Sequence, residues 1–374
     1  MSTEQGLRAG LLAGIMVRVM LMAGTISAQG MVAGTASAFT TERPTSVLIF
    51  PKVVNTNPDT IIQITNTGQM MTHAHCFYTD GRTVGGRAVW QVTDFEITLT
   101  RQQPTHWSVA QGRAVNPNDS LDGLDPGLIP PVPLGFTGFL TCVEVAADGT
   151  PVSANSLKGE ATVGDITFLG GSNAVSKYNA IGIPACGSPQ GPCGGTGEGN
   201  DGDNVLDLNN EEYAACPGGL YLNFIAEGAA DPAIEANSGP GSVVSTNLTL
   251  IPCGMDFENL VPETTAVTVD PIRNEFEERL STSFPVDCWF SSSLDGANFV
   301  PMTLNGLGTT FGKAILRPAL NSGRLPVLGV ANVLHTAADT SSDTAAMNLH
   351  ICNEQSPPSS CVPVNSEIRL PSLH

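Results

Sequence analysis

Short runs rich in Val, Ile, Thr and Phe recur along most of the chain, and Gly, Pro, Asn or Asp separates each run from the next. This pattern is typical of antiparallel β-strands joined by turns. Helical periodicity is almost absent, and a chain with 40 glycines, 27 prolines and only 14% charged residues does not suit long amphipathic helices. The sequence therefore predicts an all-β protein.

The strand-like runs form two groups, separated by a stretch rich in Gly, Pro and Asp. The first group is Ser46–Phe50, Thr60–Asn66, Thr72–Tyr78, Asp94–Thr100, Trp107–Ala110, Gly138–Val145, Leu157–Val163 and Lys177–Ile183. The second is Leu220–Ala226, Val243–Ile251, Ala266–Val269, Phe276–Ser281, Pro285–Phe290, Thr309–Leu316, Pro326–Leu334 and Ala345–Cys352.

The two groups predict two antiparallel, immunoglobulin-like β-sandwich domains, and the chain is long enough to bury two cores. We expect a first domain at 39–184, a Gly/Asp-rich linker at 185–213, a second domain at 214–352 and a C-terminal tail at 353–374. A weak internal repeat favours duplication of one unit, because residues 75–81 and 138–142 resemble residues 287–290 and 312–316 in the same order. Chance similarity between β-rich segments is the alternative.

Residues 1–38 resemble a signal peptide in their composition. Two apolar runs end in Ala36-Ser37-Ala38, a small-x-small cleavage site. Arg18 divides the apolar stretch, so neither part reaches the roughly 20 residues that span a bilayer. We therefore expect cleavage, no membrane span afterwards, and a secreted protein in the extracellular space, the periplasm or at the cell surface.

The formal net charge is -19. Such a charge repels nucleic acid, so a nucleic-acid partner is not expected. A protein or glycan partner at the cell surface is compatible with it, and solubility alone would also account for it.

Nine cysteines in a secreted chain predict a disulfide framework. Cys76 and Cys142 lie on two strand-like runs of the first group and form one expected pair. The other expected pairs are Cys186 with Cys193, Cys216 with Cys253, and Cys352 with Cys361. Cys288 is then left as a buried free thiol beside Trp289.

An acidic segment in the predicted linker offers closely spaced carboxylates. Asp201, Asp203, Asp207 and Glu212 supply hard oxygen ligands of the kind that Ca²⁺ prefers. The spacing departs from that of an EF-hand loop, because Val205 occupies the fifth position. Calcium is the cofactor that the sequence suggests, and a solvated acidic linker is the alternative.

His73 and His75 would project from one face of a strand, about 6–7 Å apart, which is a spacing suited to sharing a metal ion. Two ligands do not complete a site, and an ordinary polar strand face is the alternative. The loop from Gln102 to Trp107 is the best exposed polar and aromatic segment. We expect Gln103, His106 and Trp107 to form a recognition surface there, and burial of Trp107 in a sandwich core is the alternative.

No hydrolase, phosphate-binding or dinucleotide-binding motif is present in the sequence. We therefore expect a secreted, disulfide-braced structural or binding protein of the cell surface or extracellular space. The alternative is an extracellular hydrolase or metal-dependent enzyme with a site near His73, His75 and His106.

Overall fold

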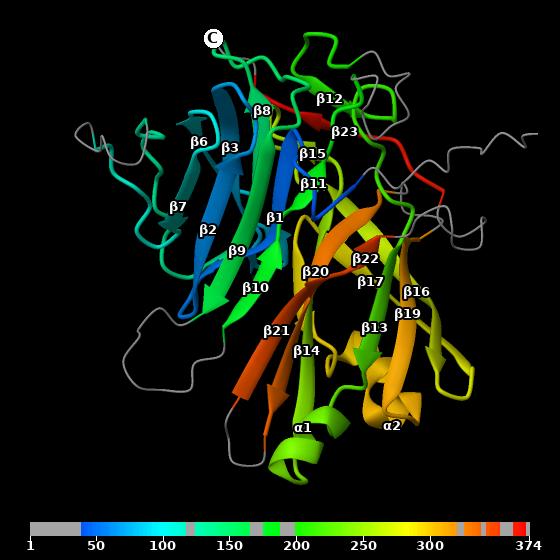
Figure 1. The fold of residues 1–374 in the computed structure, drawn as a ribbon. Coiled ribbons are helices and arrows are strands. Elements are labelled where there is room, and N and C mark those ends of the chain that lie inside the picture. The colour runs from blue at the N-terminus through cyan, green and yellow to red at the C-terminus, as the bar shows by residue number, and fades with distance from the viewer. Residues whose placement is uncertain are drawn as a thin grey trace, which may run out of the picture. The chain divides into compact units, whose positions relative to one another are not determined.

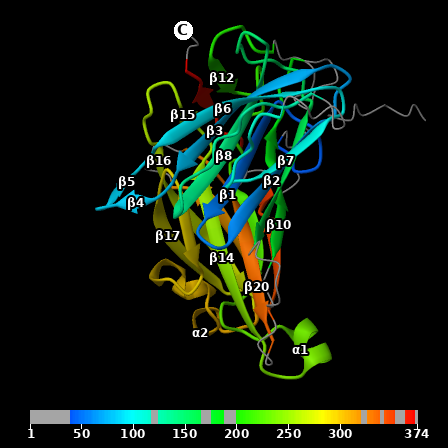
Figure 2. The same ribbon diagram turned by 90° about the vertical axis from the view of Figure 1, so that its left-hand side faces the viewer.

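The protein is mostly β, with several antiparallel sheets and almost no helix (Figures 1 and 2). The computed structural model describes residues 39–116, 124–164, 175–187, 199–319, 325–337, 342–351 and 362–371. The predicted signal peptide and Cys193, Cys352 and Cys361 lie outside these described residues.

The largest sheet has nine strands and takes up the first half of the chain. Its main path runs β10-β9-β2-β1-β8-β3-β6, while β11 pairs with β1 and β7 pairs with β2. The bounds are β1 (Val47–Asn55), β2 (Asp59–Asn66), β3 (Thr72–Asp80), β6 (Val92–Leu99), β7 (Pro104–Ser108), β8 (Phe136–Val145), β9 (Leu157–Gly164), β10 (Ser176–Asn179) and β11 (Ile181–Ile183). A small hairpin, β4 (Thr83–Val84) with β5 (Arg87–Ala88), follows β3.

Two further sheets occupy the second half. A five-stranded sheet has the order β17-β16-β19-β13-β22, and a four-stranded sheet has the order β18-β14-β20-β21. The bounds are β13 (Leu220–Ile225), β14 (Val243–Pro252), β16 (Thr264–Asn274), β17 (Arg279–Asp287), β18 (Phe290–Ser293), β19 (Phe311–Pro318), β20 (Val327–Thr336), β21 (Ser342–Asn348) and β22 (His350–Ile351). The helical elements are α1 (Pro232–Ser238), a 3-10 helix η1 (Ala297–Met302) and α2 (Leu304–Leu307).

A three-stranded sheet joins segments that the sequence did not identify as strands. β12 (Val205–Leu208) lies within the predicted linker and β23 (Ser366–Arg369) within the predicted tail. β23 pairs antiparallel with β12 and parallel with β15 (Met255–Asp256). The ends of the predicted second domain are thus tied together by backbone pairing.

The central strand β1 is buried on both faces. Val47 and Ile49 point into a core that also contains Ile251, Phe257 and Ile368, which we call the shared core. Leu48 and Phe50 point the opposite way, into a core formed by the nine-stranded sheet and the segments that cover it. Alternate residues of a strand face opposite sides, so a strand with a core on each side needs an almost continuous apolar run.

The shared core takes side chains from both predicted domains. The rings of Phe77 and Phe257 stack within it, with centroids 4.4 Å apart and an interplanar angle of 6°. A third core fills the space between the five-stranded and four-stranded sheets, with Phe224, Leu248 and Phe284 among its members. All the described residues belong to one compact unit. The division into two immunoglobulin-like domains stays a prediction.

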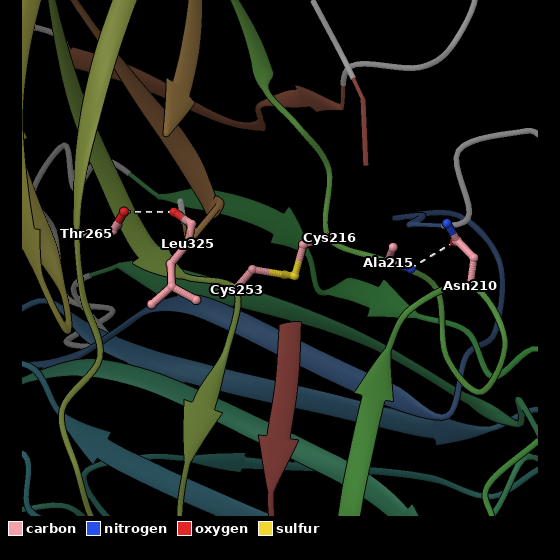
Figure 3. The surroundings of a disulfide bond; sticks show 6 residues. All are labelled: Asn210, Ala215, Cys216, Cys253, Thr265 and Leu325. Atoms are coloured by element: carbon pink, nitrogen blue, oxygen red, sulfur yellow. Dashed lines mark hydrogen bonds between the residues drawn. A yellow bond between two sulfur atoms is a disulfide. The ribbon is translucent and has the colours of Figure 1, made fainter. Parts of the chain in front are cut away.

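Two disulfides have the pairing expected from the sequence. Cys76 lies opposite Cys142 on the neighbouring strands β3 and β8, so this bond lies within one sheet, whereas the immunoglobulin disulfide joins two sheets. Cys216 is bonded to Cys253 in the shared core, close to the hydrogen bond from Thr265 Oγ1 to the carbonyl of Leu325 (Figure 3). Cys186 is also disulfide-bonded. Disulfides of this kind are typical of proteins outside the reducing cytosol.

Cys288 is a free cysteine and is buried in the shared core, with Trp289 packed against that core. Both features agree with the prediction from the sequence.

Candidate functional site

A recess of about 510 Å³ opens beside β13. We call it the β13 recess. Its lining residues belong to β13, β16 and the turn after it, β19, and the C-terminal half of β20. The lining residues are Asn223, Phe224, Ile225, Arg273, Asn274, Glu275, Glu277, Phe311, Gly312, Lys313, Val333 and His335.

The alternation of β13 explains how one strand contributes both to a core and to a recess. Leu222 and Phe224 are buried in the third core, whereas Asn223 between them is exposed and Ile225 is partly buried and packs against that core. Gly312 lies directly opposite Phe224 on β19, and a Cβ atom on Gly312 would come within 2.4 Å of the Phe224 ring. Glycine is therefore required for this ring to lie flat against β19.

The charges around the β13 recess are paired with one another. Glu277 contacts Arg273 and Lys313, each at 3.1 Å, and these two cations lower the pKa of its carboxyl group. Glu275 accepts hydrogen bonds from the backbone N–H groups of residues 310 and 311. The recess therefore offers an apolar interior with a rim of mutually neutralised charges.

His335 lies at one side of the recess and contacts Asp231, the residue that precedes α1. Its Nδ1 is 2.6 Å from Asp231 Oδ2. Asp231 is itself buried, and its other carboxylate oxygen accepts hydrogen bonds from the N–H groups of Ala233 and Ile234, which caps the helix. No Ser, Thr, Cys or Tyr is among the residues lining the recess, whereas the hydroxyl of Ser242, outside this lining, is hydrogen-bonded to the backbone of Asp231.

Both histidines of the predicted pair contact side chains of the neighbouring strand β6. His73 Nδ1 is 2.9 Å from Thr98 Oγ1, and His75 Nε2 is 3.0 Å from Asp94 Oδ2. His75 is buried and its ring packs on Phe77 at 4.3 Å. The geometry assigns both rings to cross-strand bonding.

The four predicted calcium ligands lie in and beside β12. Asp201, Asp203 and Asp207 are exposed, whereas Glu212 is buried and accepts hydrogen bonds from Asn200 Nδ2 at 2.6 Å and from the Asp207 N–H at 3.2 Å. Burial raises the pKa of Glu212 to about 7, and the three aspartates reinforce this shift. No three His, Cys, Asp or Glu side chains in the described ranges are arranged to hold a metal ion. Calcium binding at this loop, and metal binding at His73 and His75, stay predictions.

The predicted recognition loop presents only one of its three residues, which corrects the expectation from the sequence. Trp107 is 3% exposed and its Nε1 donates a 2.5 Å hydrogen bond to the hydroxyl of Tyr78. Gln103 is also buried. Its side-chain amide accepts a hydrogen bond from the N–H of Thr100 and donates one to the carbonyl of Leu124. His106 is exposed and lines a shallow recess of about 440 Å³ with Lys158 and Glu160.

The residues of the predicted enzymatic alternative do not share a site. His73 lines a recess of about 500 Å³ beside the buried Glu144, whereas His106 lines the separate recess beside Lys158. Glu144 is 1% exposed and accepts hydrogen bonds from the hydroxyls of Thr72 and Ser156, each at 2.5 Å. These bonds fasten the start of β3 and the segment before β9 to β8, which is a structural role.

Sequence reasoning did not find the β13 recess or the contact between Asp231 and His335. Neither has a local signature, because the residues come from four strands and one helix cap that only the fold brings together.

No family model and no curated protein matches this chain. Among solved structures, it is similar to the crystal structure of Thermotoga maritima 1070, at 10% identity and a TM-score of 0.24, over 37% of this chain and 95% of that one. It is also similar to a "putative secreted protein" from Parabacteroides distasonis ATCC 8503, at 10% identity and a TM-score of 0.17, over 74% of this chain and 71% of that one. Because both TM-scores are far below 0.5, these likenesses assign neither a fold family nor an activity.

Within the described residues, no helix has the length and apolar character needed to cross a membrane.

Proposed function

We propose that this protein acts outside the reducing cytosol as a disulfide-braced binding protein, and that the β13 recess is its ligand site. The observation that supports this proposal is the apolar interior formed by Phe224, Ile225, Phe311 and Val333, which stays open to solvent beside the sheet. Apolar recesses of several hundred Å³ with a few polar groups at their edge are the usual form of small-ligand sites. The disulfides support the proposed compartment.

The secreted, cell-surface location and the signal peptide at residues 1–38 belong to the same proposal. Immunoglobulin-like domains would give this function its scaffold, although loops and recesses rather than the scaffold would determine the ligand. A protein or glycan at the cell surface remains the proposed class of partner.

An apolar fluorescent probe tests the proposed site. We expect 1-anilinonaphthalene-8-sulfonate to bind the folded protein, and Phe311→Asp to weaken that binding about tenfold because it places a charge in the apolar interior. Phe276→Asp is the matched control, since Phe276 is 77% exposed and does not line the recess, whereas Phe311 is 45% exposed and does. Equal effects of the two substitutions, or no saturable binding, would reject the recess as the ligand site.

A further inference from the structure

Only one edge of β13 is fully paired. On one side, all six residues from Leu220 to Ile225 pair with β19. On the other side, within the described part of the chain, β22 pairs only with Leu220 and Tyr221. Of the remaining residues of that edge, Asn223, Phe224 and Ile225 line the β13 recess.

The direction of the free backbone groups follows from the next bond along the strand. The N–H of Ala226 donates to the carbonyl of Thr310, so residue 226 directs its backbone groups toward β19. In an antiparallel ladder alternate residues direct these groups to opposite sides. Asn223 and Ile225 therefore direct their N–H and C=O groups away from β19 and toward the recess. Tyr221, two residues before Asn223, faces the same edge and pairs there with His350 of β22.

This open edge lacks the features that normally protect an edge strand. Charged side chains and prolines discourage further pairing at a sheet edge. The edge strand β17 carries Pro285 and Asp287, and β6 carries Asp94 and Glu96. The open part of β13, residues 222–225, has the sequence Leu-Asn-Phe-Ile and contains no charged residue and no proline.

We propose that the β13 recess binds an extended peptide, which adds a strand to the open edge of β13 at Asn223 and Ile225 and continues the edge that β22 begins. This inference rests on the proposed function and names its ligand class. An added strand supplies main-chain hydrogen bonds for affinity, and its alternate side chains enter the neighbouring apolar recess.

The electrostatics of the site favour an uncharged backbone over an ionic ligand. Glu277 is already paired with Arg273 and Lys313, and His335 with Asp231. These charges already compensate one another, so an ionic group on a ligand would gain little from them. An extended peptide instead satisfies backbone groups that have no partner among the described residues.

Proline substitution separates the peptide ligand from a general apolar ligand. Asn223→Pro removes one N–H that faces the recess without removing a bond to β19, and proline is tolerated at such an edge position. Ser283→Pro is the matched control on β17, because residue 283 has the same parity as Pro285 and its N–H also faces away from the sheet.

The probe is the fluorescently labelled peptide Thr-Val-Thr-Val-Thr with blocked termini, and the same peptide N-methylated at every amide reports binding through side chains alone. We expect the unmodified peptide to bind the wild-type protein and to slow amide hydrogen exchange at Asn223 and Ile225. We expect Asn223→Pro to weaken its binding about tenfold, and both Ser283→Pro and the wild type to bind it about equally.

Binding of 1-anilinonaphthalene-8-sulfonate is measured on the same samples, so that the two proposals can fail separately. If the dye binds at the recess but the peptide does not bind, or if the N-methylated peptide binds equally well, strand addition is wrong and the ligand site stands. Unchanged peptide affinity in Asn223→Pro would also overturn strand addition. If neither probe binds, the proposed function fails and this inference fails with it.

Discussion

Trp289 Nε1 donates a 2.9 Å hydrogen bond to the carbonyl oxygen of Pro51, a residue 238 positions earlier in the chain. The same side chain lies against Gly81, where an added Cβ would come within 2.4 Å of Trp289 Cβ. Lys52 Nζ donates to Asn247 Oδ1 at 2.9 Å in the neighbouring segment. The two halves of the chain therefore meet in a specific contact that depends on the absence of a side chain at residue 81.

Gly81→Ala should destabilise the protein through this contact. The added methyl group overlaps with Trp289, and overpacking of this kind costs about 1–3 kcal/mol in the free energy of unfolding. Urea unfolding of the wild type, Gly81→Ala, Trp289→Ala and the double variant checks the cause. If the two substitutions are additive, the overlap with Trp289 is not responsible, because residues in contact should show coupling.

Glu212 should make stability depend on pH between about 4.5 and 7. Burial raises its folded-state pKa from 4.5 to about 7, so in this window the folded protein keeps a proton that the unfolded chain releases. The free energy of unfolding therefore falls as the pH rises through the window, and the contribution is lost above pH 7. We expect this contribution to be about 1–2 kcal/mol.

Urea unfolding at several pH values compares the wild type with Glu212→Gln, which cannot titrate and should flatten the dependence. Glu211→Gln is the matched control, because Glu211 is the neighbour of Glu212 in the chain and its carboxylate is exposed. Parallel pH profiles for the wild type and Glu212→Gln would contradict the assignment.

The Cys288 thiol should be unreactive in the folded protein. Burial, with a further contribution from Asp287, raises its pKa to about 12, so almost no thiolate exists at neutral pH. We expect iodoacetamide to label Cys288 only after denaturation, with peptide mapping as the measurement. Labelling of the native protein at the rate of a free thiol would show that this part of the shared core opens readily.

Local alternation was sufficient to locate most of the strands. The runs at Thr60–Asn66, Thr72–Tyr78 and Leu157–Val163 coincide closely with β2, β3 and β9. β12 and β23 were missed because each has four residues and gains its stability from a partner far away in the sequence. A short run carries too little pattern to reveal such a partner.

The functional residues were harder to predict, for two different reasons. On β7, Thr105 and Trp107 point inward while His106 points outward. Because neighbouring residues of a strand face opposite sides, Trp107 and His106 could not both belong to one exposed surface. The β13 recess has no comparable local rule. It exists because β22 leaves β13 after two residues, which is a property of topology rather than of any short segment.

Ile368 and Val47 are buried in the same shared core, and this has a consequence for biosynthesis. A chain made from its N-terminus exposes the apolar face of β1 long before residues 366–369 exist to complete that core. During synthesis and export that face needs protection, because exposed apolar strands promote aggregation. Truncation just before β23 would prolong this vulnerable stage indefinitely, although it removes only a few residues from a peripheral sheet.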